Sequence, residues 1–267
     1  MKESGAKQYV KQQDLDNRQA FNLGWWMNKE YWRLIEQYKN FQFQYRDEES
    51  FIKACNGVLP GKDLSIYSEV IKNLHEDMVS CASIVLQAKV SGAGWLAGVS
   101  NGSVSDKKGS PAFGLTFDHT SGLPFITGHQ LKGNLKSIFN EDTDYLKYVV
   151  QDDLPEYNLD EDDDIKKIKE MLFEDACLDF LGAWPCEDLK FATAVITPSK
   201  GKTKKPVPLP FLKVAQETKF RFYFEYKSKE NLDIDRLVKI LIKLIKNMGV
   251  GAKKNYDFSH FKDVRQL

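Results

Sequence analysis

Two segments of the chain alternate apolar and polar residues with a period of two. In residues 83–90 the apolar face comprises Ile84, Leu86, Ala88 and Val90. In residues 218–226 it is aromatic and comprises Phe220, Phe222, Phe224 and Tyr226. This period predicts strands that bury one face. Further short strands are expected at 114–118 and 189–197.

Other segments space their apolar residues by three and four, which predicts helices. We expect these helices at 29–39, 63–78, 129–139 and 234–248. The buried positions expected in the last helix are Ile234, Leu237, Leu241, Leu244, Ile245 and Met248. Gly249 is expected to end that helix. The order strand, strand, helix, strand, strand, helix, with long insertions, predicts an α+β fold of the ferredoxin-like (RRM-like) type.

The pattern divides the chain into two parts. Residues 1–79 are expected to form a helical, aromatic-rich N-terminal extension packed on the core, and residues 80–267 the ferredoxin-like domain. The aromatic residues of 21–45 fit either a core or a subunit interface. Glycine and serine in 91–109 predict a loop or an irregular hairpin. A basic hairpin tip is expected within 198–210, and its lysines are Lys200, Lys202, Lys204 and Lys205.

Charge is distributed unevenly along the chain. The formal net charge is zero, from 38 basic and 38 acidic residues. Residues 141–164 contain eleven acids and one lysine, so 37 basic and 27 acidic residues remain outside this acidic insert. A solvated, mobile loop is expected over 152–164. A basic body that carries an acidic insert can still bind a polyanion, because binding depends on the local electrostatic field at the site and not on the net charge of the chain.

Several classes of protein are excluded by what the sequence lacks. It has no apolar run long enough to span a bilayer, so no membrane partner is expected. The four cysteines form no CxxC pair, and reduced thiols in a cytoplasm are expected; they are Cys55, Cys81, Cys177 and Cys186. The sequence contains no HExxH, nucleophile elbow or zinc spacing. We therefore expect no metal and no cofactor, and no motif marks a catalytic residue.

The segment 122–136, GLPFITGHQLKGNLK, is the first candidate for binding. A turn leads into an extended stretch, and Gly128 opens a helix whose first backbone amides favour anions. Lys132 and Lys136 are four residues apart and therefore share a helix face. The residues that can also contact phosphate or ribose are His129, Gln130 and Asn134. The alternative is an ordinary helix with solvated lysines.

The second candidate is the glycine-rich segment 249–255, GVGAKKN, directly after a long amphipathic helix. A dinucleotide site needs a strand before its loop, and a Walker loop needs GK[ST], so neither fits. We expect backbone amides around Gly249 and Gly251 to bind phosphate beside Lys253 and Lys254. The alternative is a helix C-cap followed by a basic tail.

Together, these two segments resemble the RAMP superfamily of CRISPR-associated proteins, and within it the sixth subunits of Cmr (type III-B) effector complexes. The matching positions are Gly122, Pro124, Phe125, Ile126, Gly128, Leu131, Lys132, Gly133, Leu135, Lys136, Gly249, Gly251, Ala252 and Lys253. Segments 22–24, 195–198 and 206–212 favour the Cmr likeness, which covers about residues 80–260. Residues 255–261 depart from the family because they lack its further glycines.

The resemblance implies a non-catalytic, RNA-binding structural subunit of a cytoplasmic ribonucleoprotein in antiviral defence. Its expected partners are the CRISPR guide RNA, held toward its 3′ end, the target RNA as a further candidate, and other RAMP subunits. One alternative is a metal-independent CRISPR-repeat endoribonuclease, in which His119 would act with Tyr256 or Lys132. Another is a different RAMP backbone subunit of a type III complex.

Overall fold

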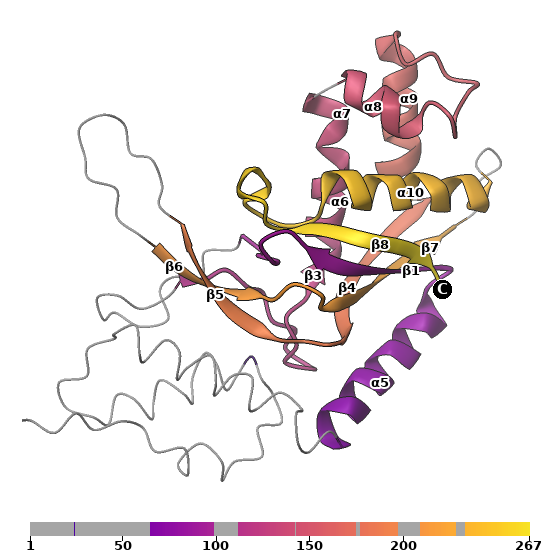
Figure 1. Ribbon diagram of the computed structural model, residues 1–267. Helices are drawn as coiled ribbons and strands as arrows, with labels where there is room; N and C mark the ends of the chain where they lie inside the picture. The colour runs from indigo at the N-terminus through magenta and orange to yellow at the C-terminus, as the bar shows by residue number, and fades with distance from the viewer. Residues whose placement is uncertain are drawn as a thin grey trace, which may run out of the picture.

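The computed structural model describes residues 24, 65–98, 112–141, 143–174, 177–196, 209–227 and 233–267. A five-stranded antiparallel sheet dominates it, in the order β3-β4-β7-β1-β8 (Figure 1). Its strands are β1 (Ile84–Ser91), β3 (Ile126–Thr127), β4 (Leu178–Glu187), β7 (Lys219–Tyr226) and β8 (His260–Gln266). A smaller sheet has the order β2-β6-β5 and comprises β2 (Ala112–Phe113), β6 (Leu209–Val214) and β5 (Phe191–Ile196).

Helices cover both faces of the main sheet (Figure 1). They are α5 (Ser65–Cys81), α6 (Gly128–Lys136), α7 (Ile138–Glu141), α8 (Thr143–Val150), α9 (Asp162–Phe173) and α10 (Ile234–Met248). Helices α6 and α10 pack on one face, and α5 packs on the opposite face. The described helices include none that is both long and apolar enough to cross a membrane.

The aromatic face of β7 forms the centre of the core. Phe220, Phe222 and Phe224 are fully buried, together with the predicted apolar face of β1. The strands predicted at 83–90 and 218–226 are thereby confirmed within one residue at each end. Helix α10 matches its predicted bounds and ends at Gly249. Ile234 was expected to be buried but is 37% exposed, because the first turn of α10 extends beyond the core.

Two strands of the main sheet, β4 and β8, were not predicted from the sequence. Strand β4 contains Gly182, at φ 126°, and Pro185, two residue types that weaken a strand pattern. The register with β7 shifts at both places, so irregularities accommodate them. Strand β8 lies at an edge and contains three charged residues, Lys262, Asp263 and Arg265, and charges on an edge strand protect it from unwanted pairing.

Two predicted elements form with different bounds. The helix expected at 129–139 is divided into α6 and α7 at Ser137, whose N–H donates to the Gly133 carbonyl. The strand expected at 114–118 forms instead at β2, and Phe117 keeps only an isolated bridge to Pro124. The helix expected at 29–39, the aromatic residues of 21–45 and most of the 1–79 extension lie outside the described residues.

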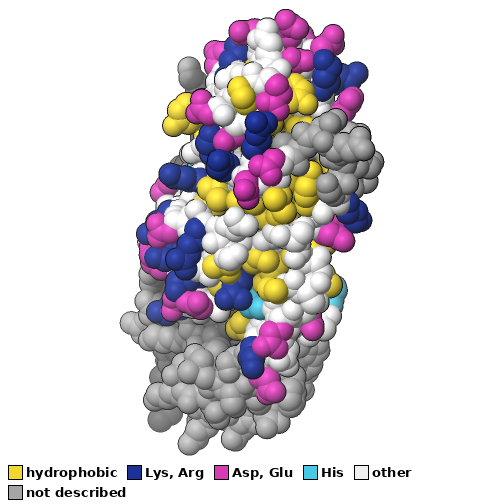
Figure 2. Space-filling model, turned by 90° about the vertical axis from the view of Figure 1, so that its right-hand side faces the viewer, with side chains coloured by type: hydrophobic (Ala, Val, Ile, Leu, Met, Phe, Trp, Pro, Cys, Tyr) yellow, Lys and Arg dark blue, Asp and Glu magenta, His cyan; other side chains and the backbone are white. Residues whose placement is uncertain are grey.

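The acidic insert is not the solvated loop that its composition suggests. Leu154 and Leu159 are 0% and 1% exposed and anchor the connection between α8 and α9 in the core. Asp162 opens α9 within a run of three aspartates, where the helix dipole favours negative charge. Figure 2 shows basic and acidic side chains interspersed over these helices, at the top of the view. The insert therefore folds as part of the domain.

Basic residues of α10 balance part of the insert's charge. Lys243 pairs with Asp153 at 2.7 Å, and Arg236 pairs with Glu156 at 3.0 Å. Both cations belong to the excess of basic residues that lies outside the acidic insert. They are therefore engaged by the insert, and the charge free to meet a polyanion must lie elsewhere.

Helix α5 covers the opposite face of the sheet. Its apolar side packs on a cluster that contains Trp184 and Tyr223. His75 of α5 is only 4% exposed; its Nε2 donates to the Pro185 carbonyl at 3.1 Å, and its Nδ1 accepts from the Tyr223 hydroxyl. Burial lowers the pKa of His75 to about 4. The neutral imidazole is thus part of the contact between α5 and the sheet.

This contact predicts that the protein loses stability in mild acid. The unfolded chain protonates His75 below pH 6.5, whereas the folded chain excludes that proton until the pH reaches about 4. The free energy of unfolding should therefore fall through this window, by up to about 3 kcal/mol from this residue. Urea denaturation of the wild type and of His75→Gln at pH 7 and pH 4 measures the difference.

The exposed His129 provides the matched control, since His129→Gln replaces a histidine that lies outside the contact between α5 and the sheet. Equal losses of stability in the wild type and in His75→Gln would contradict the assignment.

Candidate nucleic-acid interface

The two segments that the sequence singled out meet in the structure. The amide N–H of Gly251 donates to Asn134 Oδ1 at 3.2 Å, although the two residues are 117 positions apart. Asn134 Nδ2 donates in turn to the Gln130 carbonyl at 2.8 Å, and Gln130 Nε2 donates to the Ala97 carbonyl. The side-chain donors of Gln130 and Asn134, expected to contact RNA, are therefore engaged within the protein. Asn134 Oδ1 joins α6 to the glycine loop, and Gln130 Nε2 joins α6 to the segment that contains Ala97.

The backbone of the glycine loop is also engaged within the protein. Four successive amides donate to protein acceptors: Gly249 to Ile245, Val250 to Ser259, Gly251 to Asn134 and Ala252 to Leu96. The expectation that these amides bind phosphate is therefore wrong. The physical reason is that a buried N–H needs an acceptor, and this loop packs against residues 94–98.

The glycines of the loop are explained by this close packing. A Cβ on Gly251, whose φ is 134°, would lie 2.5 Å from the Leu96 carbonyl oxygen. A Cβ on Gly249 would lie 2.3 Å from the Ser259 carbonyl oxygen. Side chains would displace the loop in both cases. The loop therefore serves as a rigid support for the residues that follow it, which include Lys253 and Lys254.

Helix α6 presents three parallel rows of side chains, because residues four apart lie above one another. Gln130 and Asn134 form the row that faces the glycine loop. Lys132 and Lys136 form the row on the outer side. The row between them consists of His129 and Gly133, both exposed. The outer face of α6 thus runs from the lysines, across Gly133, toward the glycine loop.

The two glycines of α6 have opposite surroundings. A Cβ on Gly128 would lie 1.8 Å from the Phe180 carbonyl oxygen, so this glycine allows α6 to pack on β4. A Cβ on Gly133 would meet nothing within 4 Å. Glycine in a helix costs up to about 1 kcal/mol relative to alanine. No contact within the described chain accounts for the glycine at position 133.

The basic residues of this region differ in how far the protein already pairs them. Lys136 pairs with Glu174, and this hydrogen bond holds the pKa of the Glu174 carboxyl below its usual value. Lys132 forms no ion pair with a described residue, although its charge also helps to lower the pKa of the Glu174 carboxyl, and the exposed Lys253 forms no such pair either. Lys132 and Lys253 are therefore the cations of this region that are most open to a bound anion.

The basic tip expected between β5 and β6 lies outside the described residues. This applies to Lys200, Lys202, Lys204 and Lys205. The two strands that flank it pair in antiparallel fashion as far as Ile196 and Leu209.

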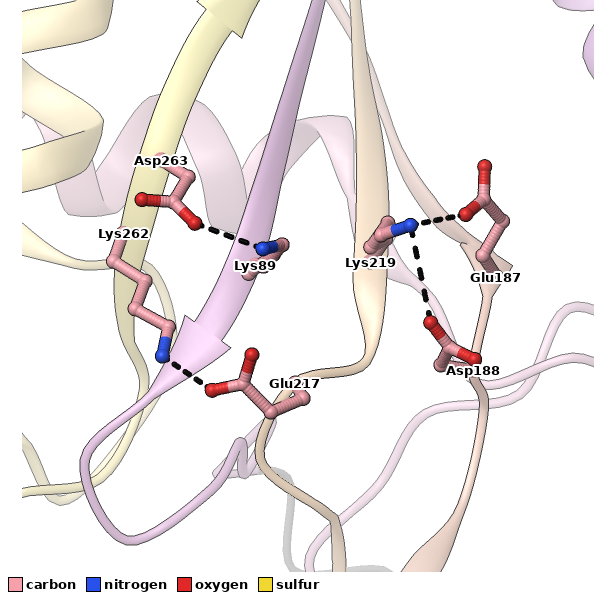
Figure 3. Close-up of polar contacts among 7 residues, drawn as sticks. All are labelled: Lys89, Glu187, Asp188, Glu217, Lys219, Lys262 and Asp263. Carbon is pink, nitrogen blue, oxygen red and sulfur yellow. Dashed lines mark hydrogen bonds and ion pairs between the residues drawn. The ribbon is translucent and has the colours of Figure 1, made fainter.

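A second group of lysines lies on the sheet face opposite to α6 (Figure 3). Lys89 is in register with both Lys219 and Lys262 on the neighbouring strands, so like charges oppose one another. Each lysine also pairs with a carboxylate; the pairs are Lys89 with Asp263 at 3.0 Å, Lys219 with Glu187, and Lys262 with Glu217. The charge of this group is therefore balanced within the chain.

The chain is similar in sequence to the CMR subunit Cmr6 of Saccharolobus solfataricus, with 28% identity over 156 residues. This match covers 56% of the chain and 48% of that relative, so the chain matches about half of the relative's length. The fold is similar to a chain of the type III-B Cmr-beta complex bound to cognate target RNA, with a TM-score of 0.53 and 20% identity. The predicted resemblance to Cmr proteins is confirmed.

The structural match to the Cmr-beta chain covers 92% of this chain and 87% of that one, and at this identity it supports the fold alone. Cmr6 of Pyrococcus furiosus aligns with a TM-score of 0.41 and 16% identity, over 67% of this chain and 96% of that one. No protein-family model matches the chain.

Asp118 and His260 lie close in sequence to His119 and Tyr256, which the CRISPR-repeat endoribonuclease alternative would use, and both are engaged within the protein. Asp118 lies next to His119, but its carboxylate accepts hydrogen bonds from the Thr120 and Ser121 amides and from the Ser121 hydroxyl. His260 Nε2 donates to the Lys254 carbonyl at 3.2 Å. Among the described residues, no group of three or more His, Cys, Asp or Glu is placed to hold a metal ion.

The contrast between the glycines of α6 predicts opposite effects on stability. Gly128→Ala should destabilise the protein by about 1–3 kcal/mol, because its methyl group overlaps a backbone carbonyl that cannot move freely. Gly133→Ala should stabilise it by up to about 1 kcal/mol, since alanine favours a helix and the space is open. Urea denaturation of both variants measures this, and equal effects would contradict the packing described for Gly128.

Proposed function

We propose that this chain is a non-catalytic, RNA-binding structural subunit of a type III-B CRISPR ribonucleoprotein. It holds the guide RNA toward its 3′ end and contacts neighbouring RAMP subunits, in cytoplasmic antiviral defence. Support comes from its similarity to Cmr6 and from its structural likeness to a chain of a Cmr complex bound to target RNA. That the chain belongs to such a complex, and that it binds the guide RNA and the other subunits there, is likewise proposed.

We also propose that the domain has the ferredoxin-like topology of RAMP proteins. The chain order β1–α6–β4–β7–α10–β8 and the spatial order β4-β7-β1-β8 support this. Each α-helix in this series connects two strands that are separated by one antiparallel neighbour, as in a split βαβ unit. Helix α5 supports a helical N-terminal extension that packs on the core.

The outer face of α6 is the observation on which the RNA-binding proposal depends. Phosphates are attracted by lysine side chains, and Lys132 is not paired with a described carboxylate. A nucleic-acid backbone needs room to approach a helix, and Gly133 leaves that room beside the lysine row. An accessible glycine next to an available lysine on a folded helix favours a phosphate backbone as the ligand.

Three acid–base side chains outside the candidate set of His119, Tyr256 and Lys132 are engaged within the protein, and this supports the non-catalytic role. His75 is buried against Tyr223, the Asp118 carboxylate is used by its own turn, and His260 binds a backbone carbonyl. An endoribonuclease remains the alternative. Incubating the pure chain with CRISPR-repeat RNA in EDTA decides between them: we expect intact RNA. Specific cuts that His119→Ala abolishes would overturn the non-catalytic proposal.

The α6 lysines should determine part of the salt dependence of RNA binding. Each phosphate contact adds about 0.7 to the slope of log K against log salt for single strands. Lys132→Ala combined with Lys136→Ala should lower affinity and reduce the slope by roughly 0.7 for Lys132 alone, or by roughly 1.4 if Lys136 exchanges Glu174 for a phosphate. Fluorescence anisotropy with a labelled guide RNA, in a series of salt concentrations, measures both quantities.

Lys72 on α5 offers a matched control, because its side chain is 71% exposed and it lies on the other side of the sheet. Lys72→Ala should leave the slope unchanged. An unchanged slope in the α6 variant would mean that its lysines are merely solvated. RNA binding that is absent from the wild type at every salt concentration would refute the proposal itself.

Gly133 gives a second, independent test at the same face. Gly133→Ala adds one methyl group to open space, so any effect on RNA reflects the ligand's approach. We expect weaker RNA binding from a variant that is at least as stable as the wild type. Unchanged affinity would show that the RNA backbone does not pass over this position.

A further inference from the structure

Two tyrosines stand out as exposed aromatic side chains among the described residues. Tyr148 is 73% exposed, and Tyr256 is 51% exposed. Single exposed aromatic side chains are common on protein surfaces, so their surroundings decide whether they indicate a binding role. The surroundings of these two tyrosines differ in both charge and packing.

Tyr148 belongs to the acidic helical region. It stacks on Tyr145, with ring centroids 6.2 Å apart, and both lie on α8 near the ion pair between Asp144 and Lys147. Its ring therefore has an aromatic partner within the chain. It belongs to a segment that is rich in acids, and these would repel a polyanion.

Tyr256 belongs to the basic turn after the glycine loop. It ends the short 3₁₀ helix η2 (Lys254–Tyr256) and follows directly after Lys253, Lys254 and Asn255. Its ring makes no stacking contact with a described aromatic residue. An exposed ring with no partner, next to lysines, is the combination that binds unpaired nucleotides.

The backbone holds this turn in one conformation. The Tyr256 N–H donates to the Lys253 carbonyl at 2.8 Å, and the Asp257 N–H donates to the Lys254 carbonyl at 3.0 Å. Lys253 and Asp257 both adopt left-handed φ angles, of 60° and 63°. Such angles cost about 1–2 kcal/mol each outside glycine, so the surrounding contacts maintain the turn against strain. The turn therefore carries Tyr256 in a defined position.

We infer that Tyr256 is a stacking platform for one unpaired base of single-stranded RNA, while Lys253 neutralises a neighbouring phosphate. The inference rests on the proposed function and deepens it, because it names the class of ligand. Lysines alone attract any phosphate backbone, whereas an exposed ring selects a base that is not already paired. Stacking tolerates every base, so the site would accept any sequence.

Substitutions at Tyr256 test this inference in binding assays with single-stranded RNA. Tyr256→Ala should weaken affinity about five- to a hundred-fold, as is typical for the loss of one stacked base. Tyr256→Phe should restore most of the affinity, because the ring stacks without its hydroxyl. Tyr148→Ala is the matched control and should bind like the wild type.

An abasic RNA separates stacking from a structural effect of the substitution. Removing the base that stacks should weaken the wild type but should not further weaken Tyr256→Ala. A 2-aminopurine at the same position should be quenched by the wild type and by Tyr256→Phe, but not by Tyr256→Ala. If Tyr256→Ala weakens binding of the abasic RNA as much as it weakens binding of the intact RNA, the stacking role is overturned.

The salt dependence distinguishes this inference from the proposed function. Tyr256→Ala should keep the wild-type slope, since a stacked base releases no counterions. Salt-dependent binding by the wild type with unchanged affinity in Tyr256→Ala would refute the inference and leave the proposed function standing. Absence of RNA binding by the wild type would instead refute the proposed function.

Discussion

The burial of one strand face determines the arrangement of the rest of the molecule. Strand β7 pairs with β1 on one side and with β4 on the other, and its three phenylalanines are fully buried. An aromatic face of this size must be covered, and α6 and α10 cover it. Because the glycine loop directly follows α10, the same packing brings that loop to α6. The contact between Asn134 and Gly251 is a consequence of this core.

That contact changes how the glycine loop can act. A glycine-rich loop beside lysines suggests phosphate binding through backbone amides, but these amides are used to attach the loop to its own domain. The loop is consequently stiff, and its side chains are what it can offer to a ligand. Lys253 and Tyr256 therefore matter more than Gly249 and Gly251. The glycines make the close packing possible, and the packing positions the side chains.

Local pairing, rather than total charge, decides which cations are available. The lysines of β1, β7 and β8 are each balanced by a carboxylate (Figure 3). The acidic insert engages Arg236 and Lys243 of α10. Pairs this exposed contribute little to stability, but they lower the field that a polyanion would meet. Near α6 and the glycine loop, the cations that form no ion pair with a described residue include Lys132 and Lys253.

The sequence by itself determined the elements whose pattern is local: strands β1 and β7 with period two, helix α10 with its glycine end, and the likeness to Cmr proteins. It could not determine β4, where Gly182 and Pro185 interrupt the pattern, or the burial of Leu154 and Leu159 in an acidic segment. Only the tertiary structure decided that Gln130 and Asn134 bind the protein itself and that Gly133 is open. Hydrogen-bond partners and free space depend on residues far apart in the chain, and no local pattern records them.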